Sequence, residues 1–111
     1  MASPFVEIIE TQALPTAAIA LYTSTGLTTR IESLSFCNTD TVNHTVTVYL
    51  VPAGGAASSS TITTSAQVLL PGQTWNSPNE YGHALNPGDS IWAFASAGSV
   101  VNIFGAGTQF S

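Results

Sequence analysis

Long stretches of this chain alternate between apolar and polar residues, which is the period of a β-strand with one buried face. Within residues 42–51, one face is expected to carry Val42, Val46, Val48 and Leu50, and the other Asn43, Thr45, Thr47 and Tyr49. Within residues 61–70, the inward set is expected to be Ile62, Ala66, Val68 and Leu70. The alternation therefore predicts strands whose outer faces carry hydroxyl and amide groups in place of charges.

Turn-forming residues separate short strand-like segments at a spacing typical of β-sandwiches. We expect strands at residues 5–10, 16–23, 28–38, 42–51, 61–70, 90–97 and 100–104, with a short strand around Trp75. Residues 38–41 are predicted to close one hairpin, and Gly98-Ser99 to close the last pair of strands. Pro71-Gly72 and residues 86–89 are predicted to be type II turns, with glycine at the position that needs positive φ.

The segment 28–38 changes the parity of its apolar positions. Ile31 is odd-numbered, whereas Leu34 and Phe36 are even-numbered, so we expect a β-bulge or burial on both faces. No segment of eight or more residues shows a capped helical period. We therefore predict an all-β protein, a single β-sandwich of about eight strands with jelly-roll topology. Residues 16–111 are expected to form the sandwich, and residues 1–15 an N-terminal arm or an edge strand.

Charged residues are unusually rare in this chain. They make up 6% of the 111 residues, with Arg30 as the single basic residue and six acids, for a formal net charge of −5. We expect no binding to nucleic acid or to anionic membranes, because both need clustered Lys and Arg. Glu7 and Glu10 stand near the N-terminus without a basic residue, so we expect no secretory signal and synthesis in a cytoplasm.

Candidate catalytic or metal-binding residues are few and poorly spaced. The side chains that come into question are His44, His83, Cys37, Asp40, Glu80 and Asp89. Their spacing matches no common zinc or calcium pattern, and the serines show no nucleophile elbow and no recognisable acid–histidine pair. We expect His44 to lie at an exposed edge, hydrogen-bonded to backbone. The sequence thus predicts no enzyme activity, no metal and no cofactor.

Two aromatic residues are candidates for a sugar-binding face. Trp75 and Tyr81 fall in the irregular stretch between residues 73 and 85, where exposed rings stack on sugars in many β-sandwiches. A carbohydrate-binding module is therefore an alternative interpretation of the chain.

A surface with so few charges suggests contact with a partner. No charged residue follows Asp89, and lysines that usually guard sheet edges are missing. Residues Phe5, Val6, Ile8 and Ile9 are candidates for an arm that adds a strand to a neighbouring molecule, although an N-terminal strand of the protein's own sheet is equally compatible with them. Arg30 is a candidate ion-pair partner for a carboxylate. The sequence predicts a self-associating or lattice-bound protein.

Several structural motifs resemble a family of virion proteins. They are Leu21-Tyr-Thr23, Leu34-Ser-Phe-Cys-Asn-Thr39, Val46-Thr-Val-Tyr-Leu-Val-Pro-Ala-Gly-Gly55 and Leu85-Asn-Pro-Gly-Asp-Ser-Ile91, within roughly residues 20–104. In length and pattern the chain is similar to the capsid decoration (staple or cement) proteins of epsilon15-like short-tailed phages.

The resemblance implies a jelly-roll homodimer that is made in the host cytoplasm and lies on the outer surface of the virion capsid. There it would clamp neighbouring major capsid proteins. A tail, neck or fibre component of a phage is the alternative within the same class. All of these roles are structural, and none requires a cofactor.

Overall fold

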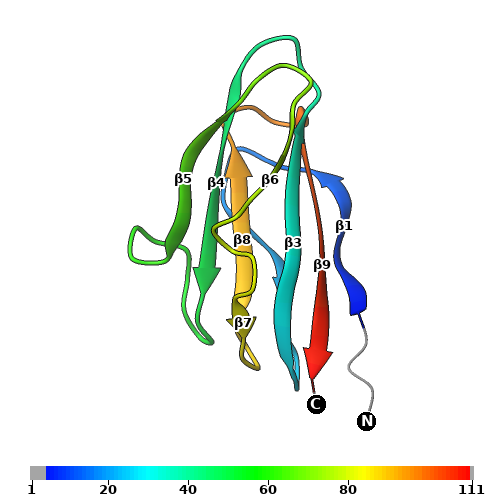
Figure 1. Ribbon diagram of the computed structural model, residues 1–111. Coiled ribbons are helices and arrows are strands. Elements are labelled where there is room, and N and C mark those ends of the chain that lie inside the picture. The colour runs from blue at the N-terminus through cyan, green and yellow to red at the C-terminus, as the bar shows by residue number, and fades with distance from the viewer. Residues whose placement is uncertain (1–4, 111) are drawn as a thin grey trace.

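Two antiparallel β-sheets pack face to face in the structure, a computed structural model that describes residues 5–110 (Figure 1). The first sheet contains β1 (Phe5–Ala13), β9 (Val101–Phe110) and β3 (Thr28–Asn38), with β6 (Thr74–Asn76) and β7 (Ala84–Leu85) both paired to β3. The second sheet has the order β2 (Ile19–Thr23), β8 (Ser90–Ala95), β4 (His44–Val51) and β5 (Ile62–Leu69).

The strand pairing is that of one long hairpin rolled into a sandwich. The pairs are β1 with β9, β2 with β8, β3 with β6 and β7, and β4 with β5. Partners such as Phe5 and Thr108, or His44 and Leu69, lie almost equally far along the chain from Ala56. The Gly-rich segment 53–60 is therefore the tip of this hairpin. The resulting order is a jelly roll, which confirms the predicted fold class.

The two hairpins predicted between neighbouring strands are wrong. β3 and β4 lie in opposite sheets, and so do β8 and β9, so residues 39–43 and 96–100 cross from one sheet to the other. Crossing lets both strands bury their apolar faces against each other. Leu34 and Phe36 of β3 share the buried core with Val46 and Val48 of β4.

The predicted parity change in β3 is confirmed as a bulge. Pairing with β9 shifts between Ile31 and Ser33, which leaves Glu32 as the extra residue. Ile31, Leu34 and Phe36 consequently all point into the core with 0% exposure. β9 accommodates the bulge with glycine: a Cβ atom on Gly107 would lie 2.6 Å from the carbonyl oxygen of Arg30.

The prediction of which residues of segment 61–70 point inward is wrong for the C-terminal half of the segment. Leu69 is buried, whereas Val68 and Leu70 are exposed. The pairing of β5 with β4 is irregular between Val46 and Val48, and Ala66 opposite this region is exposed with φ of 47°. This irregularity reverses which residues point inward.

Val42, also predicted to be inward, lies before β4 begins and is exposed. The central prediction for this strand holds, since Val46 and Val48 are both fully buried. Both predicted turns are present as well: Gly72 and Gly88 have φ of 74° and 95°, and each turn closes with the expected backbone hydrogen bond.

The N-terminal segment is an edge strand of the protein's own sheet. β1 pairs with β9 from Phe5 to Ala13, and residues 1–4 of the predicted arm lie outside the described residues. Ile8 and Ile9 are buried in the core and Val6 packs against it. Only Phe5 of the predicted arm residues is largely exposed, so the apolar groups of β1 stabilise the sandwich itself.

Candidate partner-binding surface

Three connections between strands meet at one end of the sandwich, opposite the end at which β1 begins and β9 ends (Figure 1). We call this the crossover end and define it as residues 38–44, 68–73 and 96–100. Backbone hydrogen bonds join its parts: Thr39 N–H donates to Val100 O at 2.8 Å, and Gly72 N–H to Asn38 O at 2.9 Å. The crossover end is thus a continuous surface made of segments that are far apart in the sequence.

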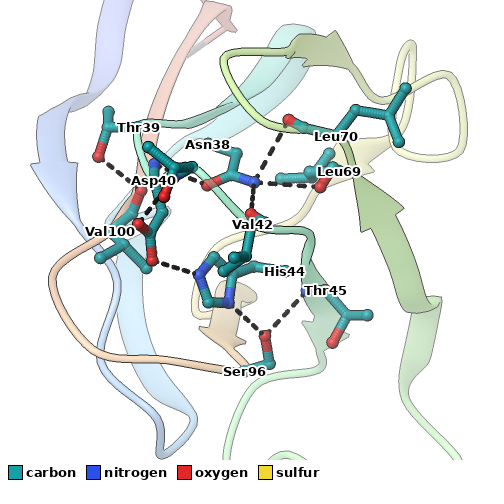
Figure 2. A network of polar contacts seen from close by, with 11 residues as sticks. Asn38, Thr39, Asp40, Val42, His44, Thr45, Leu69, Leu70, Ser96 and Val100 are labelled. Carbon is teal, nitrogen blue, oxygen red and sulfur yellow. Dashed lines mark hydrogen bonds and ion pairs between the residues drawn. The ribbon is translucent and has the colours of Figure 1, made fainter.

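The side chain of Asn38 is the centre of this end. It is fully buried at the end of β3. Its amide nitrogen donates to the carbonyl oxygens of Val42 at 2.9 Å, Leu69 at 3.1 Å and Leu70 at 3.3 Å (Figure 2). Its amide oxygen accepts from the backbone N–H of Asp40 at 3.0 Å. One side chain therefore fixes the crossover and the end of β5 together.

A second chain of hydrogen bonds runs through His44. Its Nε2 lies 2.8 Å from Asp40 Oδ2, and its Nδ1 lies 3.2 Å from Ser96 Oγ (Figure 2). The Ser96 oxygen accepts from the backbone N–H of Thr45 at 2.9 Å. Since a carboxylate only accepts, the proton of this contact is on Nε2 of His44. The expectation of an exposed His44 bonded to backbone is wrong, because its side chain is 11% exposed and both ring nitrogens contact side chains.

The electrostatics of Asp40 follow from this contact. The hydrogen bond from His44 holds the pKa of the Asp40 carboxyl below its ordinary value, and the backbone N–H of Thr41 acts in the same direction. Asp40 is partly exposed, and it is the only acid at the crossover end. The hydrogen bond from His44 thus favours the charged form of the Asp40 carboxyl.

The line of Asp40, His44 and Ser96 contains the residue types of a hydrolase triad, a grouping that the spacing of these residues in the sequence does not indicate. In a triad the serine oxygen is activated by histidine and faces donors for the developing oxyanion. Here the Ser96 oxygen is occupied by the Thr45 N–H, and the three residues connect the two sheet crossovers. The arrangement fits a structural brace better than a nucleophile.

Exposed apolar side chains lie on this braced frame. Val42, Val68 and Leu70 have exposed fractions of 55%, 48% and 55%. The carbonyls of Val42 and Leu70 bind the same Asn38 amide, and Val68 lies two residues before Leu70 on the outward side of buried Leu69. We call Val42, Val68 and Leu70 the apolar cluster. Exposed apolar side chains that lie at one end of a molecule are typical of a contact surface.

The alternation of apolar and polar residues predicted the three cluster residues in the core, but they are exposed. One signal in the sequence does point to exposure: Leu69 and Leu70 are adjacent, so a strand cannot bury both on one face. Which of the two is buried depends on the irregular pairing of β5 with β4.

The residues predicted from the sequence to bind a partner lie outside the crossover end and do not form one surface. Phe5 and Arg30 are register partners of the same residue, Thr108 of β9, so they share one row across the first sheet. Arg30 Nε lies 3.7 Å from Glu32 Oε2, which makes the predicted carboxylate partner Glu32. Of the other residues, Ile8 and Ile9 are buried.

The two aromatic candidates differ in environment. Trp75 stacks on Phe36 with ring centroids 6.0 Å apart and packs against the core. Tyr81 is exposed beside a groove. The sequence could not separate them, because both stand in the same irregular stretch.

Side chains that could bind a metal ion do not cluster in the described part of the chain. Among residues 5–110, no three His, Cys, Asp or Glu side chains are grouped as they would be around a metal ion. The same residues include no helix long and apolar enough to span a bilayer. Comparisons with family models, with curated proteins and with solved structures find no match for this chain.

Proposed function

We propose that this protein is a structural virion protein that decorates a bacteriophage capsid and stabilises it by clamping neighbouring major capsid proteins. The observation that carries the proposal is the apolar cluster of Val42, Val68 and Leu70 on the braced crossover end. The motif resemblance to phage decoration proteins supports the same role.

The rigidity of the crossover end favours binding. Asn38 and the Asp40–His44–Ser96 chain hold the backbone that carries the cluster, so little conformational entropy is lost when a partner covers it. A few side chains that are fully buried at the centre of an interface contribute most of its binding free energy. The cluster therefore suits a permanent contact with a preformed protein lattice.

Electrostatics support a contact that depends on apolar burial. The single basic residue, Arg30, is already beside Glu32, and the crossover end carries only Asp40 as an acid. Salt screens attraction between exposed charges but has little effect on apolar contacts. The protein would therefore stay bound to the capsid through the cluster at low and at high ionic strength.

A clamp needs two contact sites. A homodimer on the outer surface of the capsid presents two copies of the apolar cluster, which lets it hold two capsid proteins at once. If the dimer binds the assembled shell and not its free subunits, it stabilises the shell by mass action. The role needs no catalysis and no cofactor.

The test uses capsids of the phage that encodes this chain, prepared with and without the protein. We expect purified protein to bind capsids prepared without it and to raise the melting temperature of the shell. The protein should remain bound when the salt concentration is raised about tenfold. Light scattering on the free protein should report a dimer. An image of the virion should show the protein on the shell.

Density for the protein at the tail or neck would replace this proposal with a tail component. A shell whose melting temperature is the same with and without bound protein would contradict the stabilising role.

A further inference from the structure

A groove of about 340 Å³ lies beside β3 and the segment that follows β6. It is lined by the exposed ring of Tyr81, by Pro78 and Ser77, and by the polar side chains of Glu32, Ser33 and Asn76. Its volume falls in the range of small-molecule sites. None of these residues belongs to the crossover end, so the groove is separate from the proposed capsid contact.

Tyr81 is held in place from both sides. The preceding residue, Glu80, is fully buried, and its carboxylate accepts hydrogen bonds from Thr63 at 2.5 Å, from Thr64 at 2.8 Å and from Ser77. The following residue, Gly82, donates its N–H to the carbonyl of Ile31 at 2.7 Å. The Tyr81 side chain is nevertheless 59% exposed. The backbone on both sides of Tyr81 is therefore anchored, while its ring is exposed rather than packed in the core.

The polar groups of the groove keep free hydrogen-bonding capacity. Thr108 Oγ1 and Arg30 Nε both approach Oε2 of Glu32, at 2.8 and 3.7 Å. The oxygen of the Asn76 amide accepts from Ser35. Within residues 5–110, Glu32 Oε1 and the Asn76 amide nitrogen take part in no side-chain hydrogen bond. The groove thus offers one strong acceptor and one donor beside an aromatic ring.

We propose that this groove binds a neutral pyranose unit of a glycan. The C–H face of a sugar ring packs on an exposed aromatic side chain, and its adjacent hydroxyls both donate and accept hydrogen bonds. Tyr81 supplies the first interaction, while Glu32 and Asn76 supply the second. The Glu32 carboxylate disfavours an anionic sugar, because two like charges would meet in the groove. The inference goes beyond the proposed capsid role and gives the virion surface a glycan contact.

The experiment measures binding of maltohexaose, cellohexaose and mannohexaose to the full-length protein by saturation-transfer NMR and calorimetry. A hexamer of galacturonic acid serves as the anionic probe, and a proline-rich peptide as a non-sugar probe. We expect at least one neutral hexamer to bind. Tyr81→Ala should weaken that binding by about tenfold, and Tyr81→Phe, which keeps the ring, by less than about threefold.

Phe5→Ala is the matched control, since it removes another exposed aromatic ring and should leave binding unchanged. Both positions are exposed, so both variants should fold. Three results would overturn the proposal: none of the neutral hexamers binds, the anionic hexamer or the peptide binds in their place, or Tyr81→Ala binds as tightly as the unmodified protein.

Discussion

The amide nitrogen of Asn38 lies 3.1 Å from the carbonyl oxygen of Leu69, so the last residue of β3 is fastened to the last residue of β5 in the opposite sheet. The two residues are 31 positions apart in the sequence. The same amide nitrogen also donates to the carbonyl oxygens of Val42 and Leu70, which are two of the three residues of the apolar cluster. A buried side chain therefore sets the geometry of an exposed surface.

Replacing Asn38 should destabilise the protein strongly. Asn38→Leu keeps the branched shape of the side chain, but the carbonyls of Val42, Leu69 and Leu70 lose their donor, which should cost about 2 to 3 kcal/mol. Urea unfolding measures this change in the free energy of unfolding. Thr39→Ala is the control, because it removes an exposed hydrogen bond to Val100 and should cost less than about 1 kcal/mol. Equal losses in the two variants would contradict the central role of Asn38.

The contact between Asp40 and His44 should make stability depend on pH in the acid range. The pKa of Asp40 is lowered in the folded protein from the ordinary 3.8, so the contact stabilises the fold fully above that value. The contribution is lost as the pH falls below 3.8 and through the folded pKa. Asp40→Asn should therefore lower the melting temperature at neutral pH, and the difference should vanish in strong acid.

Glu7→Gln is the matched control for this experiment, since it removes one negative charge from an exposed position on β1. A melting-temperature difference between Asp40→Asn and the unmodified protein that persists unchanged in strong acid would contradict the assignment to Asp40.

The apolar cluster should dominate the proposed binding to a capsid while contributing little to folding. In the double variant Val68→Ser and Leu70→Ser, both changed side chains are already exposed, so the melting temperature should stay within a few degrees of the unmodified protein. Loss of two apolar contacts at an interface should weaken capsid binding by about tenfold or more. Ile19→Ser, at an exposed position on β2, is the control and should bind normally. Normal binding by the double variant would exclude the cluster as the contact.

The buried carboxylate of Glu80 should be required for stability. Glu80→Leu keeps a side chain of similar size but leaves the hydroxyls of Thr63, Thr64 and Ser77 without their shared acceptor, which should cost about 2 kcal/mol or more. Thr63→Val, which removes only one of the three donors, should cost about half as much. The measurement is urea unfolding of both variants. A Glu80→Leu protein as stable as the unmodified one would show that the hydroxyls find other partners.

The local features of the fold were predictable from the residues themselves. The strand segments, the turns at Gly72 and Gly88 and the bulge at Glu32 follow from side-chain period and backbone preference, which act over a few neighbouring residues. The site was less predictable. The Asp40–His44 pair joins residues close in sequence, but Ser96 is 52 positions from His44, and no local pattern connects them.

The sequence by itself thus determined an all-β sandwich with a polar, weakly charged surface, because alternation and composition are local properties of the chain. The tertiary structure alone decided that β3 and β4 cross between the sheets instead of forming a hairpin, since only crossing packs Phe36 and Val48 into one core. It also decided that Leu69 is buried while Leu70 is exposed, because the irregular pairing of β5 sets the direction of both side chains. The apolar cluster and the Tyr81 groove both follow from such long-range packing.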